Sequence, residues 1–149
     1  MITVRKLLEE KKQEENIYSV AAGDTVLQAL RVMADADTGA VLVSDGDQYV
    51  GIFTERDYAR DVELKSQCAK DTIIKSVMTS IMYSVKPETT VHECMELMTK
   101  QHIRHLPVVS KARVIGLISI GDVVRAVKDE AENTINDLEN YIQGTGYGR

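Results

Sequence analysis

The stretch GIFTERD at residues 51–57 returns as GLISIGD at residues 116–122, 65 positions later. Without any gap, the same shift of 65 positions aligns further identical residues: Tyr18-Ser19-Val20 with Tyr83-Ser84-Val85, Thr25-Val26 with Thr90-Val91, Met33 with Met98, and Val43 with Val108. Repetition at a fixed spacing indicates a duplicated structural unit. Each copy has only about 60 residues, too few to bury a good core alone, so we expect the two copies to pack against each other.

Each copy shows the same order of hydrophobic patterns. Apolar residues with helical spacing predict one amphipathic helix per copy, at positions 26, 29, 30 and 33 and at 91, 94, 95 and 98. Two β-rich runs follow in each copy, at 40–43 and 49–54 and at 106–109 and 114–119. Helical spacing then returns at 55–64 and 120–127. With a first short strand near Tyr18 or Tyr83, each copy is predicted as β-α-β-β-α, a mixed α/β (α+β) fold.

The rest of the chain is arranged around the two copies. We predict an N-terminal helix and lead-in at 1–16, a first repeat at 17–65, a linker at 66–81, a second repeat at 82–128, and a C-terminal helical extension with a tail at 129–149. The linker is assigned because residues 66–72 are polar and lack apolar periodicity.

Composition argues against several classes of protein. The 149 residues carry a net charge of −5, which disfavours binding to nucleic-acid phosphates, so no nucleic-acid partner is expected. The longest charge-free apolar stretch, 114–121, is far shorter than the roughly 20 residues of a membrane span. The N-terminus does not resemble a secretory signal. We therefore expect a cytoplasmic protein without a membrane partner. The spacing of Cys68 and Cys94 does not suggest a metal site.

The repeated motif places a hydroxyl residue at the end of a strand and an aspartate three residues later, at the start of a helix. This pattern is typical of a capping box, in which the two residues bond to each other's backbone amides. It also suits a phosphate-bearing ligand, because a helix N-terminus offers free amides and a carboxylate can accept both hydroxyls of a ribose. Both interpretations can hold at once.

The paired motif resembles the tandem cystathionine-β-synthase (CBS) domain pair, also called a Bateman module. The resemblance covers residues 17–127, and the stretches 54–60 and 103–108 are similar to small stand-alone bacterial members described as signal-transduction proteins. It implies two pseudo-symmetric CBS repeats with a regulatory, adenine-nucleotide-binding cleft between them. The implied ligand is AMP or NAD, or alternatively ADP, ATP or S-adenosylmethionine. The resemblance leaves no catalytic domain and no catalytic cofactor, and it implies a homodimer, with an unidentified protein partner as a further option.

The resemblance also implies which residues contact the nucleotide. The aspartate of one copy would hold the ribose, while the first strand of the other copy would lie against the adenine. The first implied site consists of Thr54, Arg56, Asp57, Met82, Tyr83, Ser84, Arg104 and His105. The second consists of Ile17, Tyr18, Ser19, Ser119 and Asp122. We expect the first site to hold phosphates better, because the 65-residue shift places glycine or alanine opposite each of its cations.

Two other functions stay open at this point. In a purely structural dimerisation module without a ligand, Asp57 and Asp122 would only cap their helices. A small enzyme is the less favoured alternative, because the sequence offers no Ser-His-Asp or Cys-His set and no glycine-rich phosphate loop. The three histidines do not suggest a zinc site either, because no acid or cysteine completes the ligand set.

Overall fold

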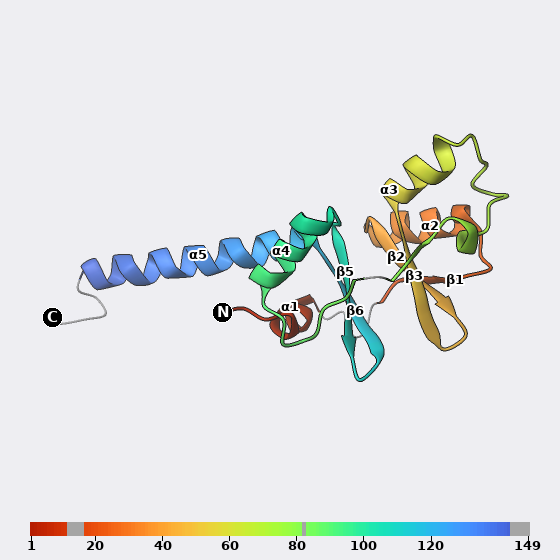
Figure 1. Ribbon diagram of the computed structural model, residues 1–149. Coiled ribbons are helices and arrows are strands. Elements are labelled where there is room, and N and C mark those ends of the chain that lie inside the picture. The colour runs from red at the N-terminus through yellow and green to blue at the C-terminus, as the bar shows by residue number, and fades with distance from the viewer. Residues whose placement is uncertain (12–16, 82, 144–149) are drawn as a thin grey trace.

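The computed structural model describes residues 1–11, 17–81 and 83–143. Two lobes lie side by side, and one helix projects from them as a rod (Figure 1). The first lobe contains β1 (Ser19–Ala21), α2 (Val26–Ala36), β2 (Ala40–Asp45), β3 (Gln48–Thr54), α3 (Glu55–Asp57), a π-helix (Tyr58–Glu63), a 3₁₀-helix (Ile74–Ser76) and β4 (Thr79–Ser80). The second lobe contains α1 (Val4–Lys11), α4 (Val91–Gln101), β5 (His105–Ser110), β6 (Arg113–Ser119) and α5 (Ile120–Ile142).

The helix ends repeat with the same spacing as the sequence. Thr25 caps α2 and Thr90 caps α4, each through a capping box with the residue three positions later. Both helices end on a residue in the left-handed conformation, Asp37 with φ 52° and His102 with φ 55°. These four positions form two pairs that are 65 residues apart, so the duplication extends to the backbone.

Strand pairing repeats in part. In the first lobe, β1 pairs with β2 in parallel, and β2–β3 and β3–β4 are antiparallel. In the second lobe, β5 and β6 form a hairpin whose register shifts after Val108, just as that of β2 and β3 shifts after Val43. Among the described residues, the first strand of the second copy is reduced to a single bridge between Val85 and Val108. The predicted mixed α+β fold is confirmed, with this shortened strand as the main difference.

Each lobe has its own hydrophobic core. In the first core, α2 packs on the sheet around Phe53, which is fully buried. Ile74, from the segment predicted as a linker, is also fully buried in this core. That segment also supplies β4, which pairs with β3. Residues 72–80 therefore pack as part of the first lobe.

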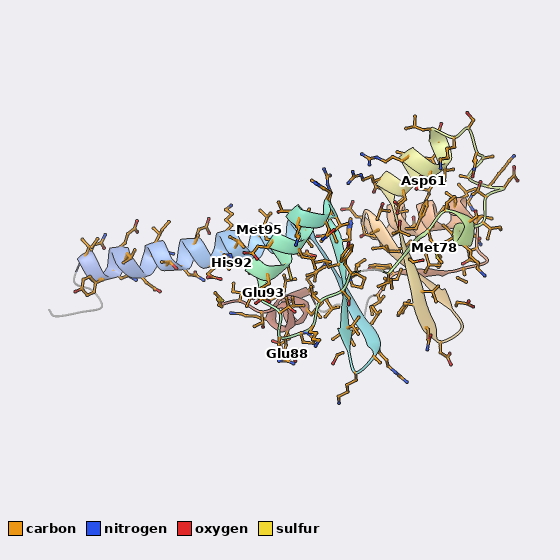
Figure 2. All side chains as sticks on the ribbon, viewed as in Figure 1. Asp61, Met78, Glu88, His92, Glu93 and Met95 are labelled. Atoms are coloured by element: carbon orange, nitrogen blue, oxygen red, sulfur yellow. The ribbon has the colours of Figure 1, made fainter. Side chains whose placement is uncertain are left out.

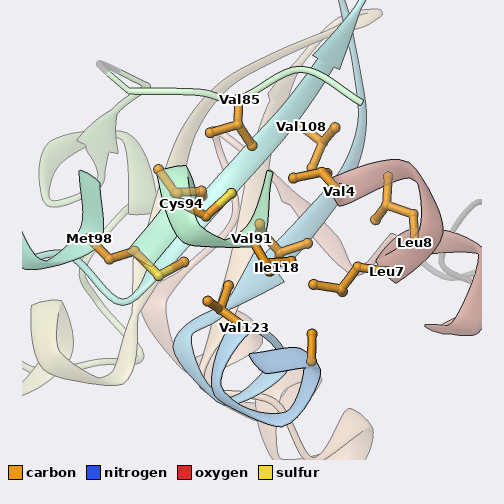
Figure 3. Packing of buried hydrophobic residues seen from close by; sticks show 12 residues of the cluster. Val4, Leu7, Leu8, Val85, Val91, Cys94, Met98, Val108, Ile118 and Val123 are labelled. Atoms are coloured by element: carbon orange, nitrogen blue, oxygen red, sulfur yellow. The ribbon is translucent and has the colours of Figure 1, made fainter. Parts of the chain in front are cut away.

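The second core contains α1, although this helix precedes the first lobe in the sequence. Val4, Leu7 and Leu8 of α1 are buried against residues of α4, β5, β6 and α5 (Figure 3). Three backbone hydrogen bonds join the start of the chain to the loop before α4 and to the first residue of α4. They run from the Val4 amide to the Thr89 carbonyl at 2.8 Å, from the Arg5 amide to the Pro87 carbonyl at 2.9 Å, and from the Val91 amide to the Ile2 carbonyl at 3.0 Å. The arrangement places the C-terminal end of α1 beside the start of α5.

Gly51 in β3 offers a test of the packing within the first lobe. A Cβ atom at this position would lie 2.5 Å from the Met78 sulfur and 2.9 Å from the Thr79 carbonyl oxygen, so the strand and its neighbour have no room for one (Figure 2 shows Met78). We predict that Gly51→Ala lowers the free energy of unfolding by about 1–3 kcal/mol, measured by urea denaturation. Gly23→Ala is the matched control, since nothing lies within 4 Å of its Cβ position and a change below about 0.5 kcal/mol is expected. Equal effects of the two substitutions would contradict this packing.

Candidate functional site

A cavity of about 550 Å³ lies between the two lobes. This volume is in the range of small-molecule sites in proteins. Its walls come from the start of α3 and the π-helix on one side and from the turn between α4 and β5 on the other. The lining residues are Gly39, Ile52, Thr54, Glu55, Arg56, Asp57, Arg60, Asp61, Thr79, His102, Ile103, Arg104 and His105.

Five residues implied for the first site meet in this cavity: Thr54, Arg56, Asp57, Arg104 and His105. Tyr83 and Ser84 are exposed and do not line it. The hydroxyl of Tyr83 instead donates to Gln101 Oε1 at 2.9 Å. Met82 lies outside the described residues. Part of the wall on the side of the first lobe comes from Ile52 and Thr79, paired residues of β3 and β4.

Asp57 is held in place by the capping box at the end of β3. Its Oδ2 accepts a hydrogen bond from the Thr54 amide at 3.0 Å, and the Thr54 hydroxyl accepts one from the Asp57 amide at 3.0 Å. Burial raises the pKa of Asp57 above its ordinary value, and the hydrogen bonds from Thr54 oppose this shift without cancelling it. Within the described part of the chain, Oδ1 accepts no hydrogen bond and no cation forms a salt bridge with the carboxylate. One oxygen is thus available to a ligand.

Positive charge gathers where the cavity widens. An adjoining hollow of about 760 Å³ shares Arg56, Arg60, His102 and Arg104 with the first, and its described lining contains no acidic residue. The guanidinium of Arg56 also donates to the His102 carbonyl at 3.2 Å, so it links the two lobes. The three arginines therefore line both hollows, whereas acidic residues line only the inner cavity.

His105 is half-buried at the inner end of the cavity, close to Gly39. Burial lowers the pKa of His105, and the nearby charges of Lys11 and Arg104 lower it further, while Asp122 raises it to a smaller extent than burial lowers it. The imidazole is therefore neutral at pH 7 and can both donate and accept a hydrogen bond.

The second implied site contains the same motif in a different electrostatic setting. Asp122 Oδ2 accepts a hydrogen bond from the Ser119 amide at 2.8 Å and one from the Lys11 ammonium at 2.5 Å, while Oδ1 accepts one from Arg125 at 3.1 Å. Burial raises the pKa of Asp122, but the hydrogen bonds from Lys11 and Ser119 together lower it below its ordinary value. The Asp122 side chain is only 6% exposed. Both of its oxygens are therefore occupied by this chain's own cations.

The other residues implied for the second site do not surround Asp122. The cavity beside Asp122 has only about 50 Å³, and its described lining includes Leu7 and Arg125 but none of residues 17–19. Ser19 opens β1, and the Tyr18 carbonyl accepts a hydrogen bond from the Leu42 amide. Ile17 is half-buried, and Tyr18 and Ser19 are exposed.

Sequence reasoning missed two residues that matter here, Arg60 and Lys11. Arg60 follows Asp57 by three positions and lines both hollows. Its counterpart under the 65-residue shift is Arg125, which bonds Asp122. The identity of these two arginines was a signal that could have found the first. Lys11 has no such signal, since only the docking of α1 on the second lobe brings it to Asp122.

Neither a metal site nor a membrane span emerges from residues 1–11, 17–81 and 83–143. No group of three or more histidine, cysteine or acidic side chains there could hold a metal ion. None of the helices in these ranges combines the length and the apolar character that crossing a bilayer requires.

Comparison with known proteins gives consistent matches. The family model for the CBS domain matches residues 13–63 and 74–129. A mitochondrial CBS domain-containing protein of Arabidopsis thaliana, CBSX3, is 43% identical over 129 residues, which are 83% of this chain and 62% of that protein. A solved structure of a protein with CBS domains from Burkholderia ambifaria is 45% identical, with a TM-score of 0.81 over 84% of this chain and 93% of that one. A CBS domain protein from Pyrobaculum aerophilum, solved in complex with AMP, is 22% identical, with a TM-score of 0.70 over 81% and 89% of the two chains.

The two aspartates should affect stability in opposite directions. At pH 7, Asp122→Asn should lower the free energy of unfolding by about 1–3 kcal/mol, because it deprives the partly buried Lys11 ammonium of its carboxylate. Asp57→Asn should raise it, because burial disfavours the ionised form of that carboxylate. Urea denaturation of both variants measures the two effects.

The pH dependence of these effects follows from the directions of the two pKa shifts. The pKa of Asp122 is lower in the folded state, so its contribution is present above about pH 4 and is lost as the pH falls through the lowered value. The pKa of Asp57 is higher in the folded state, so the gain from Asp57→Asn should shrink as the pH falls through the raised value. Shifts of the same sign in both variants would contradict this electrostatic difference.

Proposed function

Because the chain belongs to the family of CBS domain proteins and carries two copies of that domain, we propose that it is a non-catalytic regulatory module that binds an adenine nucleotide between its lobes. AMP or NAD is the favoured ligand, and ADP, ATP and S-adenosylmethionine belong to the same class. One observation carries the proposal: a single cavity joins an available carboxylate from the first lobe to guanidinium groups from both lobes. The complex of a structural relative with AMP supports the choice of ligand.

Asp57 is the proposed anchor for the ribose. Its Oδ2 stays bound to the Thr54 amide, and its Oδ1 can accept a hydrogen bond from a sugar hydroxyl. A hydrogen bond to an ionised carboxylate is about twice as strong as a neutral one. Such a bond would also recover part of the free energy that burial of the carboxylate costs. The capping box fixes the carboxylate before the ligand arrives, so little conformational entropy is lost on binding.

The phosphates of the nucleotide would lie toward the outer hollow. Arg56, Arg60 and Arg104 can form bidentate bonds with phosphate oxygens there, away from the carboxylates of the inner cavity. The neutral His105 at the inner end can bond to the polar edge of the ligand. Because acidic residues line only the inner cavity, the ligand would bind in one orientation, with the sugar inside and the anionic end outward.

We expect one nucleotide per chain. Lys11 and Arg125 already satisfy both oxygens of Asp122, so a ribose would have to displace two cations to use it. The cavity beside Asp122 is also far too small for a nucleoside. The second copy of the motif would thus stabilise the fold, and the first would bind the ligand.

Binding would change the packing of the lobes. A ligand that contacts both lobes favours the arrangement in which all its contacts form, and this differential affinity is what shifts a conformational equilibrium. We infer that the module works as a homodimer in the cytoplasm and passes the change to its own assembly or to another protein. A purely structural dimer would have the same fold but would not respond to nucleotides.

Isothermal titration calorimetry with AMP, NAD, ADP, ATP and S-adenosylmethionine tests the proposal. At least one of them should bind with a stoichiometry of one per chain. At a free ligand concentration 100 times its dissociation constant, it should raise the free energy of unfolding by about 2.7 kcal/mol. Asp57→Asn should weaken binding about 10- to 100-fold, because a charged acceptor is lost. Asp122→Asn is the matched control and should leave affinity and stoichiometry unchanged.

Two results would contradict the proposal. If no adenine nucleotide bound at millimolar concentration, the structural dimerisation module would be the better description. If Asp57→Asn and Asp122→Asn weakened binding equally, or if two nucleotides bound per chain, the assignment of the single site would be wrong.

A further inference from the structure

The outer half of α5 lies outside both hydrophobic cores. Every residue from 131 to 143 is exposed, and the helix extends away from both lobes (Figure 1). The first turn of α5 is fixed by the Ser119 capping box and by the second core, but packing of an apolar face supplies most of the stability of a helix in a protein, and residues 131–143 are all exposed. A partner along this half would therefore stabilise it.

A second apolar stripe runs along α5. The helix faces the core of the second lobe with Asp122, Val123 and Ala126. On the opposite side, the stripe has the 7, 4, 3, 4 spacing of a coiled-coil seam, and it consists of Val124, Ala131, Ile135, Leu138 and Ile142. Val124, Ile135, Leu138 and Ile142 are between 52% and 79% exposed. The stripe is thus of the kind that pairs with another helix.

The exposed area of the whole chain also favours a partner, because it is larger than that of a compact monomer. The chain, of 16.6 kDa, exposes 9652 Å². A compact monomer of this mass would expose about 7,600 Å². The excess of about 2,000 Å² is more than the roughly 800 Å² that each partner buries in an interface of standard size. A second copy of the chain could cover this surface.

The charges beside the stripe favour an antiparallel pair. Along one flank, Arg125 lies in the first half of α5, whereas Glu132 and Glu139 follow toward its end. Lys128 lies on the line of the stripe itself, between Val124 and Ala131, next to this flank. In an antiparallel pair, the same flank of both helices faces itself, and the N-terminal end of one flank lies beside the C-terminal end of the other. Arg125 of one helix then lies on the flank opposite Glu139 of the other, and Lys128 is within reach of the same Glu139 from the stripe. In a parallel pair this flank would instead meet the opposite flank, which contains Val127 and Thr134.

We propose that α5 pairs antiparallel with α5 of a second copy of this chain, through the stripe of Val124, Ala131, Ile135, Leu138 and Ile142. The inference rests on the proposed homodimer and names the surface that forms it. A membrane surface fits the stripe poorly, because one flank carries Glu132 and Glu139, which anionic lipids repel.

Oligomeric state measured by sedimentation velocity over a range of concentrations tests the pairing. The full chain should be a dimer, and Ile135→Asp should raise the dimer dissociation constant at least about tenfold, because it places a charge in an apolar seam. Asn133→Asp is the matched control. It adds the same charge to the same helix on the side away from the stripe, and the dimer should be unchanged. Circular dichroism of each variant reports whether the helix itself persists.

A charge exchange tests the antiparallel direction. Lys128→Glu and Glu139→Lys should each weaken the dimer about two- to fivefold, as expected for exposed ion pairs. The double variant should return to within about twofold of the original dissociation constant, because the exchange restores the pairing between helices. A parallel pair would give no such recovery, so its absence would overturn the antiparallel arrangement.

The remaining outcomes separate the pairing from the dimer itself. A dimer that Ile135→Asp leaves intact would overturn the pairing through α5 and leave the proposed dimer standing on another surface. A monomeric full chain at all concentrations would overturn both. Neither result bears on nucleotide binding, which the calorimetry measures independently.

Discussion

The hydrogen bond between an aspartate carboxylate and the backbone amide of the preceding hydroxyl residue determines the geometry of both halves of this molecule. It fixes the turn from β3 into α3 and the turn from β6 into α5 in the same way. The two carboxylates are therefore equivalent in covalent and backbone terms. What distinguishes them is what approaches the rest of each side chain. No cation of the described chain pairs with Asp57, whereas Lys11 and Arg125 bind Asp122.

This difference would let one copy of the motif bind the proposed ligand while the other copy is occupied by contacts within the chain. A buried carboxylate that is not paired costs free energy, and a ligand that satisfies it recovers some of that cost. A buried carboxylate that is already paired has nothing to gain from a ligand. The helix α1, which lies outside the repeat, makes the distinction by delivering Lys11 to one copy only.

Much of the fold could be predicted from the sequence, because the signals are local. The spacing of apolar residues identified the helices, and the 65-residue shift identified the two copies. The site was predictable to the extent that it lies in the motif or directly before β5, as Asp57 and Arg104 do. Three features were not predictable, and each depends on contacts between residues far apart in the chain. They are the docking of Lys11, the reduction of the strand at Val85 to one bridge, and the position of Tyr83 against Gln101 rather than in the cavity.

Because α1 packs on the second lobe, the two lobes can complete their folding at different stages of synthesis. All the elements of the first core lie within residues 17–81, so that lobe can fold as soon as this stretch has left the ribosome. The second core needs Val4 from the start of the chain and Val123 from near its end. It can close only after residues up to Ala126 have emerged. Until then the apolar face of α1 stays exposed to solvent. The first lobe folds in the meantime, from the residues that separate α1 from its binding partners in the second lobe.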